Sequence, residues 1–137
     1  MHTSESPGSM LLFNGSNTYV TGPDDVVPVI GDYTVTVWAK QLNSHPGQFS
    51  EIFAQGRNLY LGPDDNGIIR AGDAWLNTGV PFPTDQQWHH YALVRTNTNT
   101  YLYLDGNLAA TKGSPIPSPG VNGIWPHNLM IGSQWFP

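Results

Sequence analysis

Cysteine is absent from this chain of 137 residues, and charged residues make up only 11% of it. Without cysteine there is no disulfide framework and no thiol chemistry. The five lysines and arginines are scattered along the chain and outnumbered by ten acidic residues, which gives a net charge of −5. Because nucleic-acid binding requires clustered basic residues, no nucleic-acid partner is expected. Surface polarity must come from Ser, Thr, Asn and Gln, which suits hydrogen bonding to neutral polar ligands.

Long apolar runs are also absent. No segment reaches the length of a membrane-spanning helix, and the N-terminal MHTSESPGS has no apolar signal core. We therefore expect no membrane insertion, and the sequence does not distinguish an extracellular from a cytoplasmic protein. The chain length fits one domain with a sizeable core. We expect residues 1–8 to be a flexible arm and residues 9–137 to form that domain.

Helical periodicity is missing as well. No apolar pattern of period 3.6 continues for ten residues, so no helix is expected beyond one turn near residues 84–87. Fifteen glycines and twelve prolines instead indicate many turns between short strands. Such a chain is typical of an antiparallel sandwich or barrel. Strands are predicted at residues 10–14, 18–21, 33–40, 51–55, 58–61, 67–70, 75–78, 88–96, 101–104, 107–111 and 128–132.

Two local patterns support this prediction most strongly. The pair Asp105-Gly106 lies between apolar runs and predicts a tight β-hairpin, because both central residues of such a turn need a positive φ. In residues 33–40, YTVTVWAK, alternation places the two valines on one face of a strand and Trp38 on the other, with the threonines. Hairpins of this kind indicate an antiparallel arrangement.

Five segments then resemble a known family in order and spacing. They are FNGSNTYV (13–20), YTVTVWAK (33–40), QWHHYALVR (87–95), YLYLDGNLAA (101–110) and LMIG (129–132). Together they resemble the laminin-G-like modules of the concanavalin A-like lectin/glucanase superfamily. The resemblance covers about residues 12–132. It implies an all-β fold, an antiparallel two-sheet β-sandwich of the concanavalin A-like jelly-roll type, and is more specific for the fold than for the function.

The end of the chain departs from that family pattern. Such modules usually continue after the I-G strand with a further strand that pairs beside the first. Here the sequence stops at residues 135–137, so residues 10–14 are expected to lack a neighbour. An unpaired apolar edge promotes association. We therefore hypothesise a homo-oligomer formed through the sheet edge.

Glycoside hydrolases share this fold, but the carboxylates for hydrolysis are missing. The reaction needs two carboxyl groups facing each other across the scissile bond. The only glutamates are Glu5, in the polar arm, and Glu51, alone at a strand start. Most aspartates lie in turns, and the adjacent pairs at 24–25 and 64–65 cannot face each other across a substrate. We therefore expect no enzymatic activity.

His89 and His90 are the other tempting catalytic or zinc-binding pair. Because neighbouring residues of a strand point to opposite faces, the two imidazoles should diverge. We expect one histidine in a packed, hydrogen-bonded position and the other half exposed.

Tryptophans beside amide and carboxylate residues indicate where a sugar could bind. Trp75, Trp125 and Trp135 lie in segments rich in glycine and polar residues, and loops carry function. A flat indole can stack on the apolar face of a sugar ring while amides and carboxylates bind the hydroxyls. Packing of these rings into the ends of the sandwich is the alternative. The predicted carbohydrate-binding residues are Asp73, Trp75, Asn77, Trp125, His127, Asn128 and Trp135.

A sheet face is a second candidate surface. If the leucines at 102 and 104 face the core, then Tyr101 and Tyr103 face outward, and we expect Trp38 and Tyr91 on the same face. Cover of this face by a loop such as residues 113–127 is the alternative. For Trp38 and Trp88, which lie within strong strand patterns, core packing is the default interpretation.

Calcium is possible but not required as a cofactor. Laminin-G-like modules often hold one calcium ion at a loop rim, and Asp64 and Asp65 offer hard oxygens on a turn. Ordinary solvated turn residues are the alternative interpretation. The resemblance and the aromatic loops together imply a non-catalytic carbohydrate-binding protein, a lectin whose partners are glycans. A protein-interaction or adhesion module without sugar binding is the alternative function.

Overall fold

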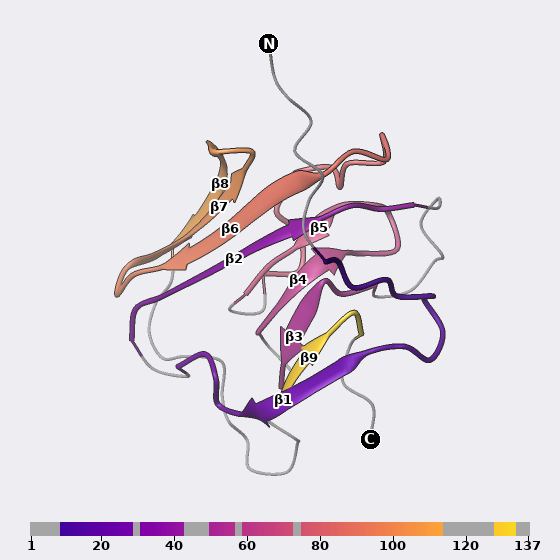
Figure 1. The fold of residues 1–137 in the computed structure, drawn as a ribbon. Helices are drawn as coiled ribbons and strands as arrows, with labels where there is room; N and C mark the ends of the chain where they lie inside the picture. Colours follow the sequence, from indigo (N-terminus) through magenta and orange to yellow (C-terminus); the bar gives the residue numbers. More distant parts are fainter. Residues whose placement is uncertain are drawn as a thin grey trace.

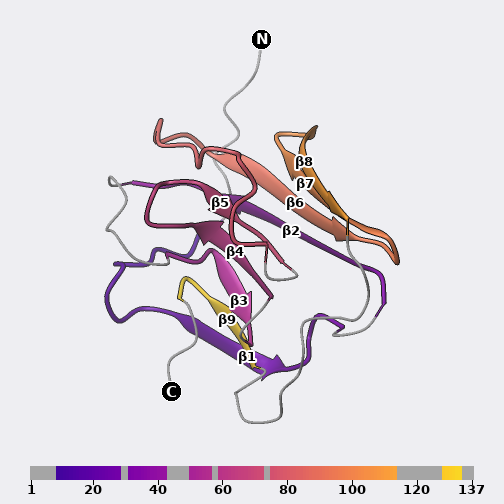
Figure 2. The same cartoon turned by 180° about the vertical axis from the view of Figure 1, so that it is seen from behind.

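Two antiparallel sheets form the structure, a computed structural model that describes residues 9–28, 31–42, 50–56, 59–72, 75–113 and 128–133. Figure 1 shows the two layers facing each other, and Figure 2 shows them from behind. Within the described ranges there are nine strands and no helix, so none that could cross a membrane. The predicted antiparallel β-sandwich is confirmed. The predicted arm, residues 1–8, lies outside the described residues.

One sheet has five strands and the other has four. The five-stranded sheet runs in the order β1 (Val20–Asp24), β9 (Asn128–Ile131), β3 (Phe53–Gln55), β4 (Leu59–Pro63) and β5 (Ile69–Arg70). The four-stranded sheet runs in the order β2 (Tyr33–Ala39), β6 (His89–Arg95), β7 (Asn99–Leu104) and β8 (Asn107–Gly113).

The core lies between the sheets and takes alternate residues from the strands. In β2, Val35 and Val37 pack against it while the alternating threonines, Thr34 and Thr36, are exposed, as the alternation predicts. In β7, Leu102 is fully buried. The fully or almost fully buried apolar side chains come from both sheets: Phe53, Leu59, Leu61, Ile69, Tyr91, Leu93 and Leu102.

Strand β9 joins β1 to the rest of the five-stranded sheet. It lies between β1 and β3, so that Ile131 pairs with Val20 on one side and with Phe53 on the other. These two neighbours belong to the N-terminal half of the chain, whereas β9 comes from its end. The sheet is therefore completed by a strand distant in sequence.

The four-stranded sheet has a different, local construction. Strands β6, β7 and β8 follow one another as an antiparallel meander, and the edge strand β2 pairs with β6. Asp105 and Gly106 have φ values of 50° and 79°, which is the backbone that the predicted tight hairpin requires. The Asp-Gly prediction is thus confirmed.

The carboxylate of Asp105 fastens this turn to β6. One oxygen accepts a hydrogen bond from the His90 backbone amide at 2.9 Å, and the other lies 2.7 Å from Nδ1 of His89. The Nε2 atom of His89 lies 3.0 Å from a carboxylate oxygen of Asp85. Because both ring nitrogens face carboxylates, the imidazole is held best as the doubly protonated cation. We call the group Asp85, His89 and Asp105 the turn clamp.

The clamp shifts the pKa of each member in the direction that favours the charged form. The hydrogen bonds that His89 donates to Asp105 and then to Asp85 raise the pKa of His89, against a smaller effect of burial. The hydrogen bond from His89 is the main cause that lowers the pKa of both carboxyls. The predicted packed, hydrogen-bonded histidine is therefore His89.

Two predicted strands are wrong. Residues 10–14 form no strand; Met10, Leu11 and Leu12 are 60–70% exposed. The chain turns immediately afterwards, because the Asn14 side-chain oxygen accepts hydrogen bonds from three following backbone amides. Residues 75–78 contribute only one isolated bridge, between Trp75 and Ala71.

A buried glutamine joins a loop to the five-stranded sheet. Gln55 is 5% exposed, and its side chain donates to the backbone carbonyl of Val27 at 2.8 Å and accepts from the Val27 amide at 2.9 Å. The amide group thus replaces a strand neighbour for the segment that follows β1. Both backbone groups would lose their partners without it.

The first prediction concerns the turn clamp and pH. A histidine whose pKa is raised by folding stabilises the protein fully below its unfolded pKa, and this contribution disappears as the pH rises through the folded pKa. The carboxyls have lowered pKa values, so their contribution is present above their unfolded pKa and is lost as the pH falls through the folded pKa. The clamp should therefore stabilise the protein most between about pH 4 and about pH 6.5.

Asp105→Asn tests this, since Asn-Gly is also a favoured hairpin turn and the change removes the charge together with one of the two acceptor oxygens. In thermal unfolding, the melting temperature of the wild type should exceed that of the variant by the largest margin near pH 5.5. This difference should shrink towards pH 9. A margin that is constant with pH would contradict the clamp.

The second prediction concerns Gln55. Gln55→Ala should lower the free energy of unfolding by about 2 kcal/mol, because two buried backbone groups lose their hydrogen bonds. Urea unfolding measures this change. Gln87→Ala, at an exposed glutamine, is the matched control and should change stability by less than about 0.5 kcal/mol. Equal effects of the two substitutions would refute the role given to Gln55.

Candidate functional site

The outer face of the four-stranded sheet is the most exposed aromatic surface among the described strands. Residues that pair across an antiparallel sheet point to the same side. Trp38 points away from the core, as alternation along β2 requires. The cross-strand partners of Trp38, Thr36 and Thr34 therefore also point outward, and each set of partners forms one row of the face. The outer face consists of Thr34, Thr36, Trp38, His90, Ala92, Val94, Tyr101, Tyr103, Leu108 and Thr111.

Trp38 is the most prominent member of the outer face. Its side chain is 62% exposed although it lies in the middle of a regular strand. Its cross-strand partner is His90, whose ring lies 5.2 Å from the indole, centre to centre, at 49°. The histidine contacts one flank of the indole and leaves most of the ring accessible. The default of core packing is therefore wrong for Trp38, whereas Trp88 is half-buried.

Tyr101 and Tyr103 occupy neighbouring outward positions on β7. Both are half-buried, while Leu102 between them is sealed in the core, as the sequence predicts. Between Leu102 and Tyr103 the pairing with β8 shifts by one residue, because Ala109 is an additional residue. This bulge brings Leu108, 54% exposed, directly opposite Tyr103 on the outer face.

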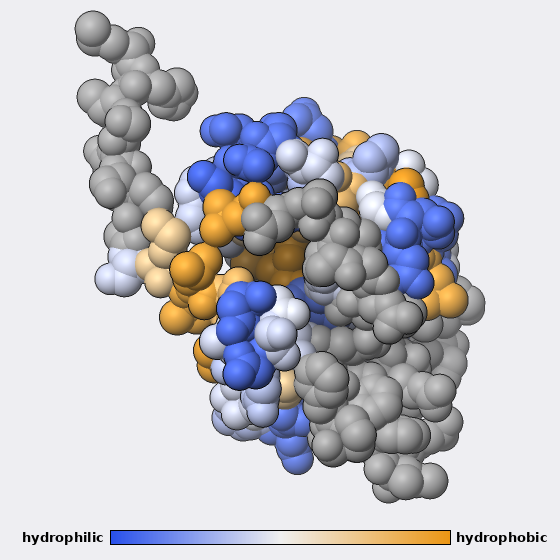
Figure 3. Space-filling model, turned by 90° about the vertical axis from the view of Figure 1, so that its right-hand side faces the viewer, coloured by the Kyte–Doolittle hydropathy of each residue, from blue (hydrophilic) through white to orange (hydrophobic). Residues whose placement is uncertain are grey.

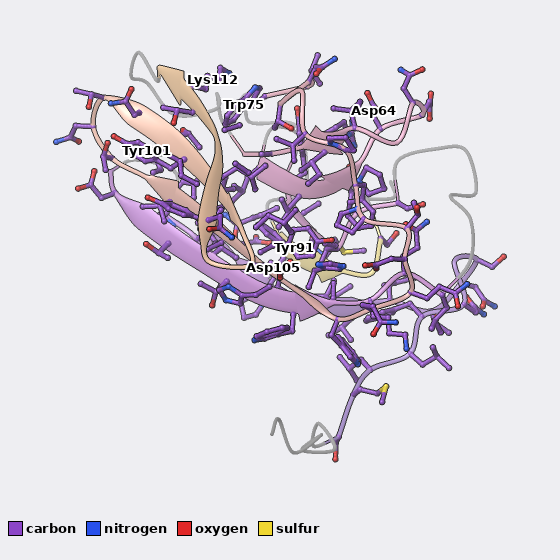
Figure 4. All side chains as sticks on the ribbon, turned by 90° about the horizontal axis from the view of Figure 1, so that it is seen from above. Asp64, Trp75, Tyr91, Tyr101, Asp105 and Lys112 are labelled. Carbon is purple, nitrogen blue, oxygen red and sulfur yellow. The ribbon has the colours of Figure 1, made fainter. Side chains whose placement is uncertain are left out.

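Tyr91 does not belong to this face, so its assignment to the second candidate surface is wrong. It is 1% exposed and lies between the two sheets (Figure 4). Its ring stacks on that of Phe82, 5.6 Å away from centre to centre. Burial, followed by the negative charges of Asp105 and Asp85, raises the pKa of its hydroxyl above the ordinary value. The adjacent residues His90 and Ala92 take the outward positions of β6.

The chemistry of the outer face is neutral and amphipathic. No carboxylate lies in its three cross-strand rows, and the threonines at its two edges supply hydroxyl groups. Exposed aromatic rings offer apolar area together with polar atoms at their rims. Such a surface can stack against flat or weakly polar groups and donate or accept hydrogen bonds beside them.

The predicted loop site is only partly described. Trp75 is 9% exposed and packs in the core, which is the alternative left open by the sequence. Asn77 is exposed and caps its own turn by accepting a hydrogen bond from the Gly79 amide, and Asn128 is half-buried at the start of β9. The other predicted members, Asp73, Trp125, His127 and Trp135, lie outside the described residues.

Glu51 is held in a buried ion pair. It contacts the guanidinium group of Arg70, and both side chains are almost completely buried. The guanidinium also lies 4.6 Å above the centre of the Tyr60 ring. Burial lowers the pKa of Arg70 to about 10, so it stays charged at neutral pH. Glu51 therefore compensates a buried charge and does not face solvent.

Asp64 stabilises a turn. Its carboxylate accepts hydrogen bonds from the backbone amides of Asn66 and Ile68, at 2.8 and 2.9 Å, while Asp65 is exposed beside it. These bonds fit the turn interpretation. In the part of the chain that the structure describes, no three His, Asp or Glu side chains are grouped so that they could hold a metal ion.

Comparison with known proteins gives a family and no individual relative. A laminin G family model, described as the Concanavalin A-like lectin/glucanases superfamily, matches residues 14–136, and no match was found among curated proteins or solved structures. The match spans nearly the whole chain and includes all nine strands. The two antiparallel sheets agree with it. The chain therefore belongs to the laminin G-like, Concanavalin A-like lectin/glucanase superfamily.

Proposed function

We propose that this protein is a non-catalytic carbohydrate-binding domain, a lectin, and that the outer face binds neutral glycans. The observation that carries the proposal is the exposure of Trp38, which is 62%, on a sheet face whose described strands place no carboxylate in its rows. An exposed indole beside other aromatic rings on the same face offers apolar area that a ligand can cover. The family includes lectins, which supports the proposal without deciding it.

The physical basis is stacking with hydrogen bonds around it. A pyranose presents C–H groups on its ring faces, which fit against the indole of Trp38 and the phenol rings of Tyr101 and Tyr103. Its hydroxyls can bond to Thr34 and Thr36 beside the rings. An open face encloses little of its ligand, so each site should bind weakly, and several copies would raise the avidity.

The proposal excludes hydrolysis for two reasons visible in the side chains. Asp85 and Asp105 stand on opposite sides of the His89 ring, which fills the space where a scissile bond would have to lie. Glu51 is paired with Arg70 and buried. Neither arrangement presents two carboxyl groups to a substrate.

A rim site remains a separate proposal. Trp125 and Trp135 would stack on the sugar there, and His127 and Asn128, which follow Trp125 in the sequence, would bind its hydroxyls. The same binding experiment can distinguish this rim from the outer face.

Protein interaction is the second candidate function, and one observation favours it. Met10, Leu11 and Leu12 form a consecutive apolar segment that is 60–70% exposed. The space-filling view in Figure 3 also shows apolar side chains at the surface. A second copy of the chain is the proposed occupant, because an uncharged apolar segment can pair with its own copy.

The third prediction concerns sugar binding. On a glycan array the protein should bind a related group of neutral glycans, and Trp38→Ala should weaken that binding at least tenfold, about 1.4 kcal/mol. The fold should be kept, since an exposed substitution changes stability by only about 0.5 kcal/mol. Leu76→Ala, at a leucine that is 63% exposed away from the outer face, is the matched control and should bind normally.

If the protein binds no glycan on the array, the lectin proposal is overturned and the adhesion alternative is favoured. Binding that survives Trp38→Ala but disappears in Trp125→Ala or Trp135→Ala would transfer the site to the rim.

The fourth prediction concerns self-association. Light scattering at micromolar concentration should give a mass of two or more chains, and Leu11→Lys with Leu12→Lys should give the mass of one, because charges oppose apolar pairing. Leu76→Lys is the control and should leave the mass unchanged. A single-chain mass for the unmodified protein would refute the oligomer.

A further inference from the structure

Resting on the proposed function, we infer that the outer face takes the interior of an extended neutral glycan chain, lying obliquely across the strands, and not a single terminal sugar. The inference follows from the spacing of the aromatic rings, the small residue of β6 next to Tyr103 and the open borders of the face.

The aromatic rings are too far apart for one sugar. Trp38 is on β2 and Tyr103 on β7, with β6 between them. Trp38 pairs with His90, whereas Tyr103 pairs with Ala92, two residues further along β6. Two strand spacings across and two residues along place the two Cα atoms about 12 Å apart. One six-membered ring is about as wide as a single strand spacing, so several linked sugars are needed to reach both rings.

The residue of β6 next to Tyr103 on the outer face is small. The central row runs Thr36, Ala92, Tyr103 and Leu108, and its residue on β6 is an alanine. Its methyl group lies between the threonine and the tyrosine, and the ring of His90 is two residues away on the same face of β6. A chain lying there could contact the sheet continuously and place its hydroxyls beside Thr36.

The borders of the face are open among the described strands. β2 and β8 are the edge strands of this sheet, and each carries an exposed side chain of the outer face, Trp38 and Leu108. A site for a chain end needs a wall against which the last sugar stops. The described part of the face provides rings at intervals and no such wall, which suits a polymer that continues past both edges.

The ring of His90 gives the first subsite its orientation. It lies against the indole of Trp38, 5.2 Å centre to centre, and the Asp105 carboxylate accepts the hydrogen bond of its backbone amide. The tilt of 49° between the rings leaves the opposite face of the indole free of His90. The turn clamp thereby helps to hold the indole in one position.

The test is the dependence of affinity on chain length. An array carrying linear neutral glucans, mannans, xylans and galactans as one, three and six units measures it, and titration calorimetry of the best series gives the affinities. For the intact protein we expect at least tenfold tighter binding of six units than of one. Trp38→Ala and Tyr103→Ala, each removing one stacking ring, should each abolish most of this ratio. Ala92→Ile should do so too, because it puts a larger side chain at this position while keeping a residue that strands favour. Leu76→Ala should keep the ratio.

The outcomes separate this inference from the function on which it rests. Equal affinity for one and six units would overturn the extended-chain inference and leave sugar binding intact. A length dependence that survives all three substitutions would overturn it as well, since the chain would lie elsewhere. No binding at any length would overturn the proposed function itself.

Discussion

The register of the β6–β7–β8 meander is the constraint on which the candidate surface depends. In a strand, a slip of one residue exchanges the core face for the solvent face. Leu102 would then leave the core, and the tyrosines on either side of it would enter. The Asp105-Gly106 turn fixes the hairpin, and the contacts of the Asp105 carboxylate with β6 fix the same turn to the neighbouring strand. A short polar group thus determines which aromatic side chains are presented to solvent.

Local patterns predicted much of the fold. The alternation in residues 33–40 and the Asp-Gly pair specify a strand and a hairpin from neighbouring residues alone, and both are confirmed. Residues 10–14 have the same apolar character but form no strand, because strand formation needs a partner that local sequence does not reveal. The predicted outward orientation of Tyr91 is wrong for a related reason. β6 carries apolar residues on both faces, so only its pairing with β2 and β7 decides which side each residue takes.

The candidate site was harder to predict than the fold. Alternation predicts that Trp38 lies on the face opposite the core valines. This local pattern is a better guide to the exposure of Trp38 than the general tendency of tryptophan to be buried. Trp75 shows the converse, since a loop-like sequence surrounds a ring that packs in the core. The bulge at Ala109 and the pairing of Glu51 with Arg70 are long-range features, set by a neighbouring strand or by a charge that burial brings near. Neither has a signature in the residues next to it.

The position of β9 between β1 and β3 has a consequence for how the domain assembles. Strands β6, β7 and β8 are contiguous, so they can pair as soon as they are synthesised. β1 and β3 cannot complete their sheet in the same way, because the strand that lies between them is the ninth and last of the described order. During synthesis on the ribosome the two layers should therefore mature in succession, the meander early and the opposite layer only after β9 emerges. Until then β1 and β3 present unsatisfied edges, and this interval is when the nascent chain is most exposed to mispairing.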